Sequence, residues 1–165
     1  MRKEQCSKCG VEARVTRGSY RFRESGLRHV ILHGIEIIRC PACGNEDPII
    51  PRLNRLMQVL ALGMVNKPCR LRGEEIRFLR KYLGKTGEEF ARLIHVDKTT
   101  LSKWENNDDR VGYQSDRLIR LLVLALGEGL QSFTASTVEA FPGIKDRKPA
   151  VRIEIDSEKM SYQYA

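Results

Sequence analysis

The sequence predicts an α+β fold, in which a small β-rich N-terminal domain precedes an all-α domain. Two Cys-x-x-Cys-Gly motifs begin at Cys6 and Cys40, and the residues between them include two β-rich runs. From Gly73 onward, apolar residues recur at helical spacing in several short segments. The chain has 165 residues, of which 41% are apolar and 30% are charged, and this composition is typical of one globular domain or two small ones.

The two cysteine motifs predict a metal site. Each motif presents two thiolates from one tight turn, and two such turns complete a tetrahedral zinc site. Four thiolates also close the coordination shell, so the expected cofactor is one structural zinc per chain rather than a catalytic zinc. A redox Cys-x-x-Cys pair and four unrelated buried thiols are the alternatives, but a redox pair usually sits at a helix start near a βαβ unit. The predicted ligands are Cys6, Cys9, Cys40 and Cys43.

Three further residues carry metal-binding side chains. His29 and His33 lie in an apolar stretch between the two motifs, where they are expected to flank a strand rather than to bind the metal. Cys69 is the fifth cysteine, and we expect a plain unpaired thiol rather than half of a disulfide.

The segment between the motifs predicts antiparallel strands over Arg14–Phe22 and Val30–Ile38. A region of about 45 residues buries little apolar surface, so metal binding is expected to supply much of its folding free energy. Pro48 and Pro51 are expected to end this domain. Arginines interleave with the aromatic residues of the hairpin, which indicates either a solvated strand face or a surface for nucleic acid or a partner protein; they are residues 14, 17, 21, 23 and 28.

An amphipathic helix is predicted after the prolines. Its apolar stripe is explained either by packing against a neighbouring domain or by a dimer seam. The stripe consists of Leu53, Leu56, Met57, Leu60 and Met64.

Three short helices follow in close succession. The first is predicted over Glu74–Tyr82. The second begins at a capping box formed by Thr86 and Glu89. After a turn at residues 95–96, Asp97 is a suitable N-cap for a third helix over Lys98–Glu105. A helix, a short turn and a second helix are the geometry that places a helix end in the major groove of DNA.

The residue order of this segment closely resembles the Xre, or phage-repressor, class of helix-turn-helix. The order is Thr86-x-x-Glu89-Phe90-Ala91-x-x-Ile94-x-Val96-Asp97-x-x-Thr100-Leu101-Ser102-x-Trp104-Glu105-Asn106. Together with the upstream cysteine motifs, residues 6–126 resemble the YgiT-type zinc-finger/helix-turn-helix family of MqsA-like antitoxins. The resemblance implies a sequence-specific DNA-binding transcriptional repressor, and further the antitoxin of a type II toxin–antitoxin system that regulates its own operon. A protein-interaction module that neutralises a toxin through its zinc domain is the alternative, and no enzymatic activity is expected.

The resemblance also assigns roles within the recognition helix. It places Lys98, Thr99 and Lys103 at base edges, while Thr100 and Ser102 lie near the DNA backbone. Solvated helix positions without a DNA contact are the alternative interpretation of these residues. The same comparison pairs Arg80 with Glu105 as a structural ion pair.

Four ranges are expected along the chain: a zinc-binding domain at 1–50, a linker helix at 51–69, the helix-turn-helix domain at 70–126, and a C-terminal extension at 127–165 with short strands at 151–156 and 160–164.

Residues 118–126 contain more apolar side chains than one helix face can bury, which predicts a homodimer. The net charge of +8 and the lack of a membrane-spanning run favour double-stranded DNA as a partner and a cytoplasmic location. A cognate toxin is implied by the resemblance alone.

Overall fold

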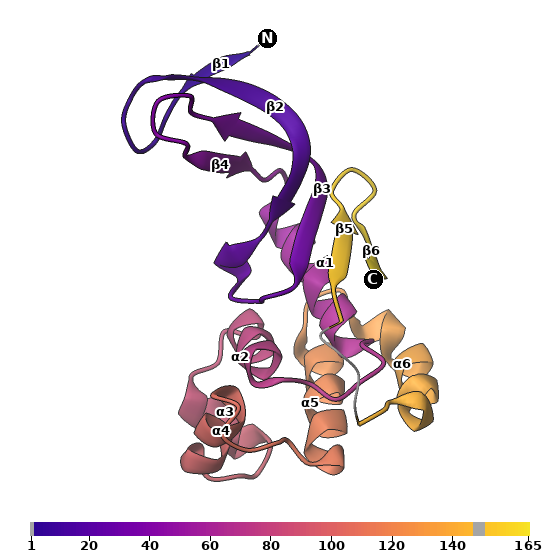
Figure 1. Cartoon of the computed structure of the whole chain (residues 1–165). Coiled ribbons are helices and arrows are strands. Elements are labelled where there is room, and N and C mark those ends of the chain that lie inside the picture. The colour runs from indigo at the N-terminus through magenta and orange to yellow at the C-terminus, as the bar shows by residue number, and fades with distance from the viewer. Residues whose placement is uncertain (1, 147–150) are drawn as a thin grey trace.

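The computed structural model describes residues 2–146 and 151–165, and these residues form a curved six-stranded sheet that stands on a group of helices (Figure 1). The strands follow the order β1-β2-β3-β5-β6, and β4 also pairs with β3. Their bounds are β1 Lys3–Gln5, β2 Glu12–Arg21, β3 Val30–Arg39, β4 Glu46–Ile49, β5 Ile153–Asp156 and β6 Ser161–Tyr164. The fold is α+β, as the sequence predicts.

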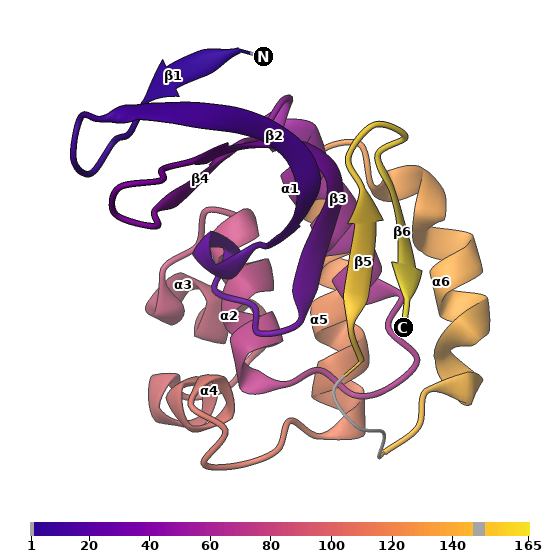
Figure 2. The same cartoon turned by 45° about the horizontal axis from the view of Figure 1, so that its top comes forward.

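Strand β3 organises the sheet because it pairs along both edges. One edge pairs with β2 in an antiparallel register that shifts between Gly18 and Tyr20. The other edge is shared: residues 36–39 pair with β4, while residues 30–33 pair in parallel with β5. The two ends of the chain therefore meet in one sheet, and Figure 2 shows β5 beside β3, with β6 on the other side of β5.

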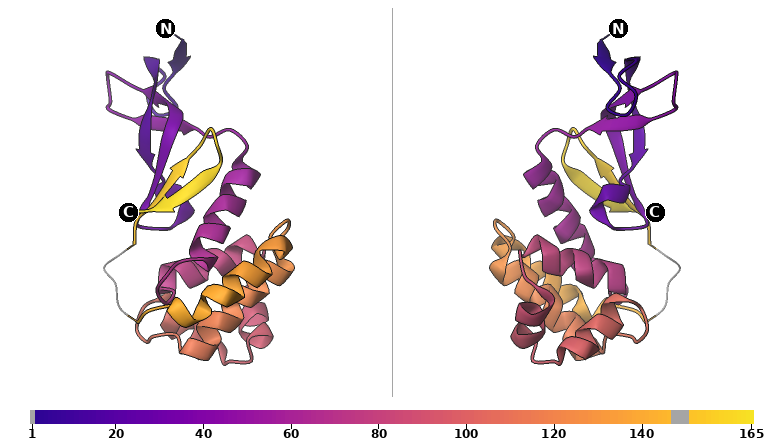
Figure 3. Two further views of the ribbon diagram at one scale, coloured as in Figure 1. Left: turned by 90° about the vertical axis from the view of Figure 1, so that its right-hand side faces the viewer. Right: turned by 90° about the vertical axis from the view of Figure 1, so that its left-hand side faces the viewer.

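The helices begin with α1, Leu53–Val65, which runs from the sheet into the helical part of the molecule (Figure 3). Below it lie α2 Gly73–Tyr82, α3 Gly87–Leu93, α4 Lys98–Glu105, α5 Tyr113–Leu126 and α6 Thr134–Ala140, with 3-10 turns at 23–25, 131–133 and 141–143. Helix α6 was not predicted from the sequence. In the C-terminal extension, β5 and β6 occupy the two segments for which strands were expected.

Buried side chains from the sheet and from the helices form one continuous apolar core. Leu32 of β3, Leu60 of α1, Leu79 of α2 and Ile155 of β5 all belong to it and are fully buried. At the far end of the sheet, a second small cluster contains Ala13 with Cys6 and Cys40. The lower part of the sheet is thus held by apolar burial, whereas the upper end has little apolar surface to bury.

Two local expectations prove wrong. Pro48 does not end the N-terminal domain, because it lies within β4 opposite Ile37, whereas Pro51 lies between the end of β4 and the start of α1. Strand β4 is short and lies at the side of the sheet, where a missing N–H is tolerated. In α1, Leu56, Leu60 and Met64 are buried as the stripe predicts, but Leu53 is half exposed because the first turn of the helix extends past the core.

A buried polar network joins α5 to the segment between α1 and α2. The guanidinium group of Arg120 donates hydrogen bonds to the carboxylate of Asp116 and to three backbone carbonyls, with lengths of 2.6–2.9 Å. Those carbonyls belong to Val65, Lys67 and Cys69. Asp116 in turn accepts from the Leu71 N–H at 2.7 Å. Since an unpaired buried polar group is costly, this network determines the path of the chain into α2.

No helix within residues 2–146 and 151–165 is both long and apolar enough to cross a membrane.

Candidate metal centre and nucleic-acid interface

The four predicted cysteine ligands come together at the upper end of the sheet. Their sulfur atoms all lie within 4.8 Å of one another. The Cys6 and Cys43 sulfurs are 3.6 Å apart, and those of Cys9 and Cys40 are 3.5 Å apart. A tetrahedral zinc with Zn–S bonds of about 2.3 Å requires sulfurs about 3.8 Å apart, so the arrangement fits such an ion. The four cysteines can therefore hold a metal.

The two cysteine turns have the same backbone geometry. In each, the glycine after the second cysteine donates its N–H to the carbonyl of the first, at 2.9 Å for Gly10 and 3.0 Å for Gly44. Both glycines have a positive φ, 72° and 69°, which other residues adopt only with strain. Asp47 ties the turns together, because it accepts hydrogen bonds from Ser7 and Asn45.

Backbone amides favour the thiolate form at the first cysteine of each turn. The N–H of Cys9 lowers the pKa of the Cys6 thiol to about 6, and the N–H of Cys43 lowers the pKa of Cys40. Thiolates are the form that binds metal. The Val11 N–H also lowers the pKa of Cys9, but hydrogen bonds with the Cys40 and Cys43 sulfurs outweigh this effect, so the pKa of Cys9 is raised instead. The first cysteine of each turn is therefore the one whose surroundings favour the metal-binding form.

The two histidines lie outside this site. His33 is in β3, where its Nδ1 lies 2.8 Å from the Ser19 hydroxyl and its Nε2 faces Glu154 at 3.5 Å. Neither histidine belongs to the cysteine group, which is the one potential metal-binding cluster in the described chain.

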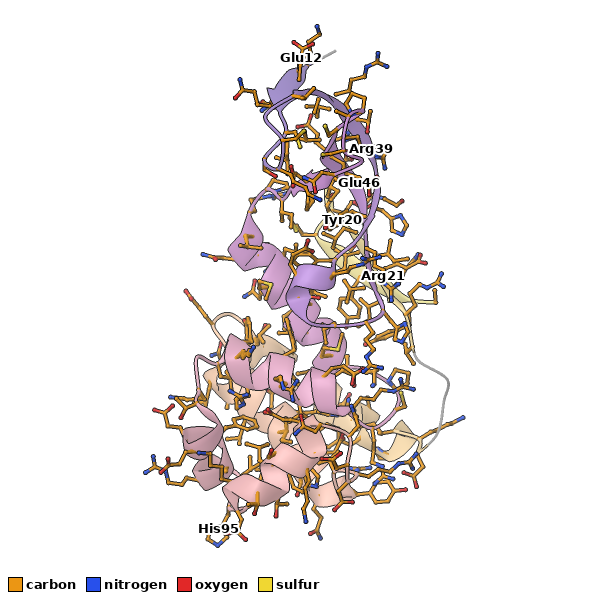
Figure 4. All side chains as sticks on the ribbon, turned by 60° about the vertical axis from the view of Figure 1, so that its left-hand side comes forward. Glu12, Tyr20, Arg21, Arg39, Glu46 and His95 are labelled. Carbon is orange, nitrogen blue, oxygen red and sulfur yellow. The ribbon has the colours of Figure 1, made fainter. Side chains whose placement is uncertain are left out.

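At the opposite end of the molecule, α3 and α4 form the helix-turn-helix. Figure 4 shows His95, in the turn between these helices, far from Glu12 near the cysteine turns. The capping box is present: Glu89 N–H donates to the Thr86 hydroxyl at 3.2 Å, and Thr86 N–H donates to the Glu89 carboxylate at 2.8 Å. Ala91 is buried, and its carbonyl accepts the Val96 N–H at 3.0 Å, which closes the turn.

The residues between α3 and α4 set the start of α4. His95 adopts a left-handed conformation with φ of 55°. Asp97 occupies the N-cap position of α4, as predicted, although its side chain makes no capping hydrogen bond. Leu101 and Trp104 point into the core as predicted.

The predicted ion pair between Arg80 and Glu105 is present and bidentate. Arg80 Nε donates to Glu105 Oε1 at 2.6 Å, and Nη2 donates to Oε2 at 3.0 Å. Arg77 adds a contact to the same carboxylate at 3.3 Å. Because Glu105 is buried at the end of α4, this pair holds α4 against α2.

The remaining α4 side chains of interest face outward. Lys98, Thr99, Ser102 and Lys103 are exposed, and Thr100 is half buried. Thr99 and Lys103 are four residues apart, so they share one face of the helix. Exposure makes these residues available to DNA, although it does not distinguish a DNA contact from a solvated position.

Two features of this end were missed in the sequence. Gly73 begins α2 so close to α4 that a Cβ would lie 2.3 Å from the Trp104 carbonyl oxygen. Its N–H donates to the Asn107 side chain at 2.8 Å. The Asp116–Arg120 network was also missed, and its only sequence signal is the i,i+4 spacing of opposite charges.

A comparison with protein families agrees with this geometry. Residues 76–130, from α2 through α5, match the family model described as helix-turn-helix. This match supports a DNA-binding regulator of the Xre type, and such a domain is regulatory rather than catalytic. No curated protein and no solved structure matches the chain.

Proposed function

We propose that this protein is a sequence-specific DNA-binding repressor that reads its operator with α4. The observation that carries the proposal is the helix-turn-helix match, together with four exposed polar side chains on α4. Lys98, Thr99 and Lys103 contact base edges, since Lys bonds guanine O6 or N7 and a Thr methyl packs on the thymine methyl. Thr100 and Ser102 contact the backbone. The excess of basic residues and the DNA target fit a cytoplasmic protein.

Replacing Lys103 with Ala tests this assignment. We expect cognate DNA binding to weaken by about 1–3 kcal/mol per half-site, because one base contact is lost, while non-specific binding changes much less. The measurement is a mobility-shift assay on the protein's own promoter region, with a scrambled competitor, at two salt concentrations. The control is the double replacement Arg21→Ala and Arg23→Ala on the β2–β3 hairpin, which should keep the sequence preference. If the control loses the preference and Lys103→Ala keeps it, α4 is not the reading element.

The metal is proposed to be one structural zinc per chain on Cys6, Cys9, Cys40 and Cys43. Purified protein should contain one zinc equivalent, and only Cys69 should lie outside the metal site. A chelator should release the zinc and make four additional thiols titratable. Metal-free native protein with five reactive thiols would contradict the proposal and favour a thiol–disulfide enzyme instead.

A homodimer is proposed because repressors of this class read paired half-sites about one helical turn apart. In α5, Ile119, Val123 and Leu124 are buried within the chain, whereas Leu118 and Leu126 remain 38% and 51% exposed. We expect a dimeric mass at micromolar concentration by sedimentation. Replacement of both exposed leucines with Ser should shift the equilibrium toward the monomer if this face forms the interface. A wild-type monomer, both free and on DNA, would contradict the dimer.

The antitoxin role is proposed from the resemblance to the YgiT-type, MqsA-like family. One observation favours a partner protein at the metal end: the cysteine turns project away from the helices, so both ends can be occupied at once (Figure 1). A neighbouring gene for a small toxin and co-purification of its product with this chain would test the role. An interaction module without DNA binding is the alternative, and the mobility-shift assay separates the two.

A further inference from the structure

A cavity of about 490 Å³ lies between the β2–β3 hairpin, the segment before α2, and the loop that follows α4. Its volume is within the range of small-molecule sites. Four arginines from these three parts of the chain contribute to its lining: Arg28, Arg70, Arg72 and Arg110. Residues distant in sequence thus bring positive charge to one cavity.

The charged groups of the cavity are unequally paired. Its three carboxylates all accept hydrogen bonds, but only Asp146 has a counter-charge, which is Arg70. Glu74 accepts from the neutral Asn107 side chain at 3.2 Å, and Asp109 accepts from the backbone N–H of Arg110 at 2.7 Å. Arg70 is further engaged by the Val111 carbonyl at 3.0 Å and by the Tyr113 ring.

The other three arginines are different. Across residues 2–146 and 151–165, no hydrogen bond or ion pair involves the guanidinium group of Arg28, Arg72 or Arg110. A guanidinium group presents a fork of donors that suits phosphate. The cavity therefore offers several anion donors that have no internal acceptor.

The lining also includes apolar side chains. Leu71, Ile76, Trp104 and Val111 contribute to the cavity only by their edges, because all four are buried and Trp104, the most exposed of them, has 7% of its surface exposed. A bare phosphate would not cover these edges, whereas a ligand with a compact apolar body would cover them.

We propose that this cavity binds a small molecule that carries a phosphate group on a compact apolar or aromatic body. The phosphate is held by Arg72 and Arg110, with Arg28 at the hairpin side. The apolar body lies against the edge of Trp104. The ligand would thus touch both α2 and the end of the recognition helix.

The test uses the full chain without DNA, so its outcome does not depend on the proposed repressor function. Phenyl phosphate is titrated while the fluorescence of Trp104, the single tryptophan, is recorded. We expect a saturable change and a rise in melting temperature. Inorganic phosphate should bind about tenfold or more weakly, because it buries no apolar surface, and phenol should give no saturable change.

Variants provide the matched comparison. Arg72→Gln combined with Arg110→Gln should weaken phenyl phosphate binding by about tenfold or more, since two charge-assisted contacts are lost. Arg14→Gln, an exposed arginine on β2, should leave it unchanged. If the double variant fails to fold by circular dichroism, Arg28→Gln on the hairpin should weaken binding in its place.

Three results would overturn the proposal. One is the absence of saturable binding up to about 10 mM phenyl phosphate, well above the millimolar dissociation constants of weak ligands. Another is unchanged binding in the folded double variant or, where that variant does not fold, in Arg28→Gln. The third is equal affinity for inorganic phosphate and phenyl phosphate. If DNA binding by the arginine variants also depends less steeply on salt concentration, the cavity is a contact for the DNA backbone.

Discussion

Replacing Arg120 with Leu is expected to lower the free energy of unfolding by about 3–5 kcal/mol. The Arg120 side chain is fully buried, and its removal leaves the Asp116 carboxylate without its counter-charge. Three backbone carbonyls before α2 also lose their donor. Since a native domain is stable by only about 5–15 kcal/mol, a loss of this size should be plain in urea unfolding followed by Trp104 fluorescence.

Two further variants separate the network from simple packing. Asp116→Leu alone should also destabilise, because it leaves a buried arginine unpaired, but the Asp116→Leu and Arg120→Leu double variant should lose less than the sum of the two. Arg14→Ala on the exposed side of β2 should change stability by less than about 0.5 kcal/mol. An Arg120→Leu protein within 1 kcal/mol of wild type would show that the network contributes little.

Replacing Cys43 with Ser should abolish tight metal binding and unfold the upper end of the sheet while the helices stay folded. Structural zinc sites contribute on the order of 10 kcal/mol, and the cluster beside the cysteines contains little else to hold that end. The lower part of the sheet belongs to the main core, so we expect the loss of structure to stop near Ile35 and Ile37.

Hydrogen exchange measures this boundary directly. Amides of β1, of β4 and of the adjoining halves of β2 and β3 should lose protection, and those of α5 should keep it. Cys69→Ala is the control, because Cys69 is buried outside the metal site and its loss should leave the metal in place. Loss of protection throughout the chain in one cooperative step would show that the metal end supports the whole fold.

Short-range patterns in the sequence determined much of this protein. The spacing of two cysteines within a turn specifies where their sulfurs can lie, and the turn glycine allows the positive φ that follows. The capping box at Thr86 and the Arg80–Glu105 pair were likewise predictable, because the first is local and the second belongs to a familiar helix-turn-helix order. The α+β class followed from the same local periodicities.

Only the tertiary structure decided what depends on contacts between distant segments. Sequence periodicity predicts strands near the C-terminus, but not that β5 lies beside β3 and joins the two ends of the chain in one sheet. Nothing local marks Gly73 as the place where α2 meets α4, or brings Arg28, Arg72 and Arg110 to one cavity. Such placements result from packing of the whole core, because the stable arrangement is the one in which distant surfaces fit together closely. Contacts of this kind produce no periodic pattern in the sequence from which they could be predicted.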